Sequence, residues 1–410
     1  MRMLLSTIGS RGDVQPLLAL ALHLKTLGHS VRLCVPPDFR EWIERFGIAV
    51  TPIGPEIKKF AAKPRGPADA PSPEQLRQMM DATIATQFET IGAAASDCDV
   101  IVAATALQIA ARSVAEKKGI PYFFAAYSAT VLPSLHHSPP PLPGEAPGLR
   151  RASAPEREGR PANQQLWEQD AARFNDHFRP ALNAYRVSLG LAAVDDVRSY
   201  MFTDRPWLAA DPTLGPWPDA DDGVFQTGAW ILEDDRPLSS ELLMFLDGGE
   251  PPIYFGFGST AATRDEGQVM LQAARALGRR AIVSRGWFDH SIIDEQPDCL
   301  SIGDANLHAL FPRVAAIVHH GGAGTTTAAA LAGTPQVVVP HRYDQHYWAA
   351  RVATLGIGGA HAPGAMTVES LTAALEHSRK GEVVTQAATI AGSVRRDGVR
   401  VAAGRIMSGS

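Results

Sequence analysis

The sequence predicts an α/β fold of two doubly wound halves, because strand-like and helix-like segments alternate in two separate series. The first series opens with an apolar strand over residues 3–8. A helix with Pro16 in its first turn and Gly28 at its end follows, and then a strand over residues 31–35. The second series begins near residue 253. Strands joined through helices run parallel, and such sheets bind ligands beyond the carboxyl ends of their strands. We therefore expect two Rossmann-like domains that face each other across a cleft.

Further elements continue each series in order. The first half adds apolar strands over residues 100–103 and 121–124, with a helix between them over residues 107–118. Helical segments resume over residues 163–190. In the second half we expect strands over residues 253–257, 281–284, 315–319 and 337–340, with helices near 266–278, 324–332 and 345–355.

Length and composition agree with this fold and exclude several classes of protein. The 410 residues exceed what one core usually serves, and 45% are hydrophobic while 20% are charged. A net charge of -5 gives no basic footprint for nucleic acid, and no segment approaches the ~20 apolar residues of a membrane helix. Three cysteines far apart favour a reducing compartment and form no zinc motif. We expect a cytoplasmic monomer with no nucleic-acid partner and no stable membrane insertion.

Two segments interrupt the alternation and suggest the domain organisation. Residues 133–165 are rich in proline and too long for an ordinary connection, which is typical of a functional lid or of a disordered segment. Residues 211–222 are rich in proline and aspartate and resemble an interdomain linker. We therefore expect a first domain over residues 1–210 and a second over residues 223–410, with the last helix returning to the first domain.

The strongest motif is the run His-His-Gly-Gly-Ala-Gly-Thr-Thr-Thr over residues 319–327, which follows an apolar strand and opens a helix. Glycines let backbone N–H groups approach a ligand closely, and a helix N-terminus favours an anion. The motif predicts a diphosphate site, formed by His320, Gly322, Ala323, Gly324 and Thr325. The alternative is a glycine turn that serves only tight packing of strand and helix.

Two acidic positions also lie at expected strand ends. Asp344 and Gln345 follow the strand 337–340, and a carboxylate beside an amide suits the paired hydroxyls of a hexose. Asp13 ends the run Gly-Ser-Arg-Gly-Asp after the first strand, where its carboxylate could take a proton from an acceptor hydroxyl. For both aspartates the alternative is a helix cap. Ser259 could bind phosphate or ribose, and Trp287 could supply a wall for a base or be plain packing.

Together these residues resemble the bacterial nucleotide-sugar glycosyltransferases of family one, which have the GT-B fold. Within that family the chain looks most like the enzymes that glycosylate glycopeptide aglycones, and it is more distantly similar to the sterol glucosyltransferases. The resemblance covers essentially the whole chain. It rests on residues 9–13, 113–117, 119–122, 203–204, 206–207, 209–212, 226–232, 256–259, 319–326 and 344–345.

The resemblance implies an inverting, metal-independent transfer of a hexose, with glucose favoured. The donor is a UDP or TDP sugar and the acceptor is a hydroxyl of a natural-product aglycone, foremost a phenolic glycopeptide type. No cofactor or metal is expected. Asp13 is the expected catalytic base with Ser10 beside it, and Asp344 and Gln345 hold the donor sugar. Arg11, Ser259, Trp287 and Asn306 join the glycine-rich motif around the donor nucleotide. Residues 133–165 would cover the acceptor, with Tyr127, His136 and His137 as acceptor-binding candidates.

Some positions depart from the family pattern and leave alternatives open. The chain has Gly303 where plant relatives stack the base on a tryptophan, and Ala328 where they bind ribose with a glutamate. Leu307 replaces a histidine of many glycopeptide relatives. The choice between UDP and TDP therefore stays open. A nucleotide-sugar 2-epimerase, a sterol or polyketide glycosyltransferase, and an auxiliary subunit of the same shape are the rival interpretations, and the long loop favours transfer over epimerisation.

Overall fold

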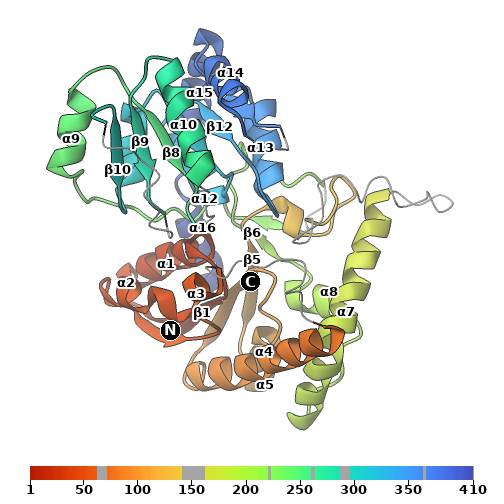
Figure 1. Cartoon of the computed structure of the whole chain (residues 1–410). Coiled ribbons are helices and arrows are strands. Elements are labelled where there is room, and N and C mark those ends of the chain that lie inside the picture. Colours follow the sequence, from red (N-terminus) through yellow and green to blue (C-terminus); the bar gives the residue numbers. More distant parts are fainter. Residues whose placement is uncertain are drawn as a thin grey trace.

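The structure is a computed structural model that describes residues 1–61, 72–140, 162–219, 223–259, 264–286, 296–362 and 366–409. Two parallel sheets form two lobes, each with helices packed around its sheet (Figure 1). The predicted fold class is confirmed. We call the part built around the seven-stranded sheet the first lobe and the part built around the six-stranded sheet the second lobe.

The first sheet has the strand order β3-β2-β1-β4-β5-β6-β7, and all its pairs are parallel. Its central strand β1 is an unbroken apolar run, in which Met3, Leu4 and Leu5 are at most 1% exposed. Such runs are typical of parallel strands covered by helices on both faces. The strands are β1 (Arg2–Thr7), β2 (Ser30–Val35), β3 (Ala49–Pro52), β4 (Val100–Ala104), β5 (Tyr122–Ala126), β6 (Trp207–Leu208) and β7 (Phe225–Gln226).

Helices connect these strands, and two of them are long. The helices are α1 (Arg11–Thr26), α2 (Arg40–Glu44), α3 (Ile57–Ala61), α4 (Pro73–Ala94), α5 (Ala111–Lys118), α7 (Ala162–Ser188) and α8 (Val197–Phe202). The predicted helix over 107–118 begins four residues late. The Gln87 side chain, from α4, bonds the Leu107 carbonyl at 2.7 Å and the Ala110 N–H at 3.0 Å, and so satisfies this backbone outside a helix.

The second sheet has the order β10-β9-β8-β11-β12-β13, again with parallel pairs. Its strands are β8 (Ile253–Gly256), β9 (Ala281–Ser284), β10 (Cys299–Ile302), β11 (Ala316–His319), β12 (Gln336–Val338) and β13 (Gly358–Ala360). The helices of this half of the chain are α9 (Ser240–Asp247), α10 (Arg264–Ala276), α11 (Leu307–Leu310), α12 (Ala323–Leu331), α13 (Gln345–Thr354), α14 (Val368–Ser378), α15 (Gly381–Ala391) and α16 (Gly398–Ser408).

The chain crosses between the lobes later than the sequence indicates. β7 pairs with β6 in the first sheet, and Trp230 is 4% exposed in the first lobe's core. The first lobe therefore extends beyond residue 222, past the predicted linker and into the predicted second domain. The last helix, α16, packs on α1 and adds Ala402, Ala403 and Ile406 to the same core.

The order of the strands places the site. In each sheet the chain starts in the middle, at β1 or β8, and later adds β4 or β11 on the other side. Ligands bind at the carboxyl ends of strands at such switch points. The residues that follow β1 include Asp13, and those that follow β11 form the glycine-rich motif. The topology thus gives each lobe one switch point that carries predicted site residues.

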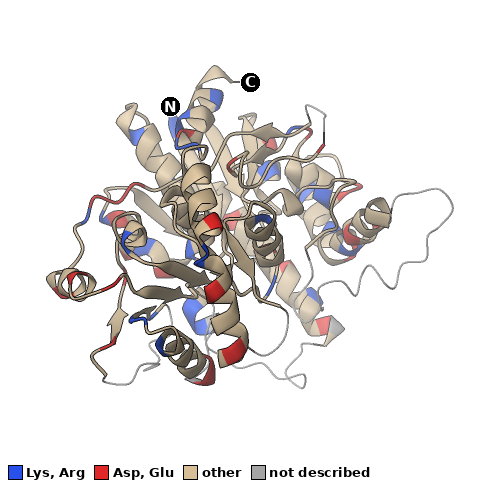
Figure 2. Ribbon diagram, turned by 90° about the horizontal axis from the view of Figure 1, so that it is seen from above, with Lys and Arg blue, Asp and Glu red and all other residues tan. Residues whose placement is uncertain are grey.

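Basic and acidic residues are interspersed along the ribbon (Figure 2). Of the helices in the described part of the chain, none combines the length and apolarity that crossing a membrane requires.

Candidate active site

Asp13 lies in the first turn of α1, directly after the switch point of the first sheet. Ser10 is the N-cap residue of this helix. Asp13 Oδ2 accepts hydrogen bonds from the Ser10 backbone N–H at 2.6 Å and from the Ser10 hydroxyl at 3.1 Å. Gly9 permits this turn, because a Cβ at that position would lie 2.2 Å from Asp13 Oδ2. The helix cap that we weighed against a catalytic role is therefore present, and it fixes the carboxylate in place.

Burial raises the pKa of Asp13 to about 6, although the hydrogen bonds from Ser10 act in the opposite direction. Removal of water disfavours the charged carboxylate more than these bonds favour it. A carboxylate with this pKa is a stronger base than an ordinary aspartate, yet it is still ionised at neutral pH. The environment of Asp13 therefore suits proton removal.

The turn after β11 is held by a fully buried histidine. His319 Nδ1 accepts a hydrogen bond from the Gly321 N–H at 3.1 Å, and its Nε2 lies 2.9 Å from Gln336 Oε1. Gly321 has a φ of 90°, and a Cβ there would lie 2.7 Å from Val338 Cγ1 and 2.9 Å from the Gln345 carbonyl oxygen. Glycine is required at this position, and the turn passes close to the start of α13.

Helix α12 begins without a side-chain cap, because its N-cap residue is Gly322. The N–H groups of its first turn and the positive end of the helix dipole therefore remain available at the carboxyl edge of the sheet. The hydroxyls of Thr326 and Thr327 donate to carbonyls four residues earlier, at 3.0 and 2.8 Å, and are used within the helix. The predicted diphosphate residues form this uncapped end, namely Gly322, Ala323, Gly324 and Thr325.

His320 lies beside this helix end as a neutral imidazole. Burial, together with the neighbouring His319 and His341, lowers its pKa to about 3. Its Nδ1 is buried and has no hydrogen-bond partner among the described residues. Buried polar atoms without a partner are costly and uncommon, so this one indicates a place for a ligand atom. His320 can take part in binding an anion through a hydrogen bond rather than through a positive charge.

Asp344 precedes α13 but does not cap it. Its side chain makes no capping hydrogen bond, and Oδ2 instead accepts one from Trp348 Nε1 at 3.0 Å. The helix-cap alternative is therefore wrong for this side chain. Gln345 Oε1 accepts hydrogen bonds from the backbone N–H groups of His341 and Arg342 at 2.8 and 3.0 Å. The Gln345 oxygen thus holds the loop, and its NH₂ group makes no hydrogen bond within the described ranges, so it can donate to a ligand.

The carboxyl groups of Asp13 and Asp344 come from different lobes and interact electrostatically. Burial raises the pKa of Asp344 to about 6; the bond from Trp348 lowers it, and the charge of Asp13 raises it. Helix α1 also contacts α12 across the lobes. Since the charge of Asp13 acts on the ionisation of Asp344, we assign the two carboxyls to one site to which each lobe contributes one acid.

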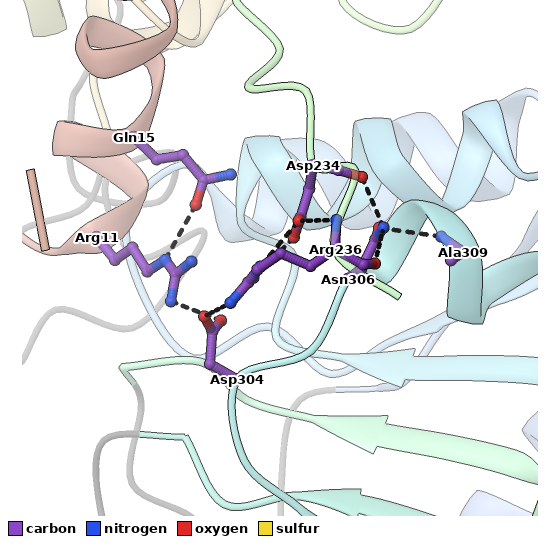
Figure 3. A network of polar contacts seen from close by, with 7 residues as sticks. All are labelled: Arg11, Gln15, Asp234, Arg236, Asp304, Asn306 and Ala309. Atoms are coloured by element: carbon purple, nitrogen blue, oxygen red, sulfur yellow. Dashed lines mark hydrogen bonds and ion pairs between the residues drawn. The ribbon is translucent and has the colours of Figure 1, made fainter. Parts of the chain in front are cut away.

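Arg11 joins the two lobes through a network of charged side chains (Figure 3). Its Nη1 donates to Asp304 Oδ1 at 2.8 Å, and its Nε donates to Gln15 Oε1 at 3.0 Å. Asp304 Oδ2 also pairs with Arg236 at 3.0 Å, and Arg236 pairs with Asp234 at 2.7 Å. We expected Arg11 to contact the donor nucleotide. In this structure its guanidinium binds a carboxylate of the second lobe.

Asn306 has a structural role in place of the expected contact with the nucleotide. It is the N-cap residue of α11, and its Oδ1 accepts a hydrogen bond from the Ala309 N–H at 3.1 Å (Figure 3). Its Nδ2 donates to the carbonyls of Asp234 and Arg236 at 2.6 and 2.9 Å. Both amide hydrogens are therefore used within the protein, and none remains to donate to a donor substrate.

The three acceptor-binding candidates also have partners within the protein. The Tyr127 hydroxyl donates to the Asp13 backbone carbonyl at 3.2 Å, so it supports the first turn of α1. His136 has a largely exposed side chain that lies 3.4 Å from Asp219. His137 Nε2 lies 2.9 Å from the Leu132 carbonyl, and its ring packs edge-on between two tryptophans, Trp167 and Trp217. Burial lowers the pKa of His137, which favours its neutral form.

Part of the predicted site and linker lies outside the described residues. Trp287 lies outside the described residues, as do residues 141–161 of the acceptor loop and residues 220–222 of the expected linker. Ser259 is described and follows Gly258, where a Cβ would lie 3.1 Å from His320 Cε1. Ser259 therefore adjoins the glycine-rich motif. Within the described ranges, no three His, Cys, Asp or Glu residues are grouped as a metal site.

Sequence reasoning missed two residues of this site. Trp348 bonds the carboxylate of Asp344, and its position one helical turn later was a usable signal. Asp304 binds Arg11 from 293 residues further along the chain. No local pattern indicates that partner.

Comparisons with known proteins agree with the fold and the motifs. The N-terminal domain of glycosyltransferase family 28 matches residues 3–135, and the C-terminal domain of erythromycin biosynthesis protein CIII-like proteins matches residues 270–396. Vancomycin aglycone glucosyltransferase of Amycolatopsis orientalis is 45% identical over 98% of this chain and 96% of that protein. A dTDP-epi-vancosaminyltransferase of the same organism is 40% identical over 95% of this chain and 93% of that protein.

More distant matches agree with the broader resemblance. An Arabidopsis thaliana sterol 3-beta-glucosyltransferase is 27% identical over 96% of this chain and 66% of that protein. The crystal structure of the kitacinnamycin glycosyltransferase superposes with a TM-score of 0.71, covering 99% of this chain and 98% of that one at 19% identity. The chain therefore belongs to the GT-B-fold nucleotide-sugar glycosyltransferases, close to those that modify glycopeptide antibiotics, and it is a glycosyltransferase.

Proposed function

We propose that this enzyme moves a hexose, with glucose as the leading candidate, from a nucleoside-diphosphate sugar to a hydroxyl of a natural-product aglycone. A phenolic glycopeptide-type aglycone is the leading acceptor, and the 45% identity to vancomycin aglycone glucosyltransferase supports that choice. The observation that carries the proposal is that Asp13 of one lobe acts electrostatically on Asp344 of the other, while α1 contacts α12, whose N-terminus has no side-chain cap.

The geometry suits an inverting transfer. Asp13 removes the proton of the acceptor hydroxyl as its oxygen attacks the anomeric carbon from the face opposite the leaving diphosphate. The first-turn N–H groups of α12 and the imidazole of His320 bind the departing charge. Asp344 accepts hydrogen bonds from the sugar hydroxyls while the NH₂ group of Gln345 donates to them. In this proposal the helix end and the imidazole do the work that Mg²⁺ does in other enzymes.

A donor-by-acceptor matrix analysed by mass spectrometry tests the proposal. UDP- and TDP-hexoses are paired with phenolic glycopeptide, polyketide and sterol acceptors. We expect the mass of one hexose to be added to a glycopeptide aglycone, with the opposite anomeric configuration by NMR and with unchanged turnover in EDTA. Transfer to sterols alone would reassign the acceptor, and a sugar that is altered in the absence of any acceptor would indicate an epimerase.

A further inference from the structure

The indole of Trp348 holds the carboxylate of Asp344. Trp348 follows Asp344 by one turn of α13 and is 1% exposed. Its Nε1 donates to Asp344 Oδ2 at 3.0 Å. An aspartate at the start of a helix ordinarily turns toward the first free N–H groups of that helix. Here the carboxylate makes no such capping bond, so the indole has taken the place of the cap.

The ring of Trp348 is in turn fixed by a segment of the first lobe's chain. A Cβ added to Gly215 would lie 2.8 Å from Trp348 Cη2, so backbone and ring are in close contact. Arg351, one turn after Trp348, donates from Nε to the Leu214 carbonyl at 2.7 Å. Asp211 shapes this segment, because its Oδ1 accepts hydrogen bonds from the Thr213 and Leu214 N–H groups at 2.8 and 3.1 Å.

One apolar core continues through this contact from lobe to lobe. Trp348 belongs to the same buried cluster as Leu214 and as Ile8, which follows strand β1. Trp348, whose ring packs against residues of both lobes, therefore donates a hydrogen bond to the Asp344 carboxylate at the site. Nothing in the chemistry of transfer requires Trp348 to touch a substrate, so its influence must pass through Asp344.

We propose that Trp348 is a positioning residue for the donor sugar: its indole keeps the Asp344 carboxylate away from the free backbone N–H groups at the start of α13 and orients it toward the sugar hydroxyls. Because Gly215 of the first lobe contacts the ring, the orientation of the Asp344 carboxylate then depends on the relative position of the two lobes. This inference rests on the proposed function, in which Asp344 binds the donor sugar.

Trp348→Phe tests the proposal, because it keeps an aromatic ring and removes only the N–H donor. We expect the KM for the nucleotide sugar to rise about tenfold, the usual effect of losing one hydrogen bond to a charged group, with kcat changed less than about threefold. The acid limb of kcat/KM for the donor should move to higher pH, since the indole N–H favours the ionised carboxyl.

A double-mutant comparison shows whether the effect passes through Asp344. In an Asp344→Ala background, Trp348→Phe should change donor use by less than about twofold, because the carboxylate is already absent. Trp230→Phe is the matched control, since it removes an indole N–H bond of 3.0 Å in a tryptophan that is 4% exposed in the first lobe. We expect that control to leave the acid limb of the donor pH profile in place.

Gly215→Ala provides a second test if Trp348→Phe fails to fold. This variant keeps the indole and displaces its ring, and we expect a several-fold rise in donor KM with unchanged acceptor KM. Effects of Trp348→Phe and Asp344→Ala that multiply, or an unmoved acid limb in an active Trp348→Phe enzyme, would overturn the inference while leaving the proposed function intact. A wild-type enzyme that transfers no sugar in the acceptor matrix would instead refute the proposed function.

Discussion

An aspartate lies at the N-terminal end of α1 and another at that of α13, and the two carboxylates are held by different means. Asp13 is held by Ser10, three residues away, in a local arrangement that the sequence itself contains. Asp344 is held by Trp348, whose ring is placed by chain from the other lobe. Burial raises the pKa of both carboxyls to about 6. Burial thus gives both carboxyls a similar pKa, whereas their orientation is fixed differently: by residues three positions apart in one lobe, and by an indole that packs against the other lobe in the second.

Asp13→Asn should have the largest effect, because it removes the proposed base while the amide oxygen can still accept the bonds from Ser10. We expect turnover to fall by roughly 10²–10⁴, or about 3–5 kcal/mol of transition-state stabilisation. Single-turnover kinetics with saturating donor measure this directly. A variant that keeps near-full turnover would remove Asp13 from the role of base and leave it as a cap.

Asp344→Ala should have a smaller effect on a different parameter. We expect donor kcat/KM to fall by about 1.5–3 kcal/mol, the range for a hydrogen bond to a charged group, while acceptor KM is retained. Initial rates over a grid of donor and acceptor concentrations separate the two. Unchanged donor kinetics would show that Asp344 does not bind the donor sugar.

The pH dependence of stability should show the cost of burying a carboxyl. The pKa of Asp13 is about 6 when folded and 3.8 in a model peptide. As pH rises from 3.8 to 6, the unfolded chain ionises this group before the folded protein does, so stability is lost across that window. The free energy of unfolding of Asp13→Asn, relative to that of the wild type, should therefore rise by about 1–3 kcal/mol from pH 4 to pH 8. Urea denaturation at both pH values measures this gain, and equal differences at the two values would contradict it.

The same raised pKa values predict an acid limb of activity. The base must be ionised to accept a proton, so kcat/KM should fall tenfold per pH unit below about pH 6. The fall becomes steeper where Asp344 must be ionised too. Values of kcat/KM between pH 4.5 and 8 check this, and a flat profile down to pH 5 would show that at least Asp13 has an ordinary pKa in the free enzyme.

The smallest effect is expected for the Arg11–Asp304 ion pair, which joins the two lobes. Arg11 and Asp304 pair at 2.8 Å with partly exposed side chains, so the pair should contribute only about 0.2–1 kcal/mol and be screened by salt. Asp304→Asn should change donor kcat/KM by less than about fivefold at low salt, and by less still in 0.5 M NaCl. A large, salt-independent loss would show that Asp304 contacts the donor itself.

Much of this site could be predicted because its signals are local. The glycine-rich run predicted a turn and a helix end, and the structure shows both, since the φ of Gly321 and the absence of a cap at Gly322 follow from residue type. Asn306 was predicted to contact the nucleotide, but its amide donates to two backbone carbonyls of the protein. A motif does not reveal which hydrogen-bond partners an amide side chain will have. The linker was also predicted too early. Composition indicated a domain boundary at residues 211–222, but the pairing of β7 with β6 keeps the chain in the first lobe beyond those residues.

The sequence by itself determined the two β-α series, the glycine turn and the position of both aspartates at strand ends, because each depends on residues close together in the chain. Tertiary structure alone decided that the ring of Trp348, which bonds Asp344, packs against Gly215 of the other lobe, that Arg11 reaches Asp304, and that the charge of Asp13 acts on the ionisation of Asp344. Burial and long-range contacts set these properties, and neither exists until the lobes have folded against each other.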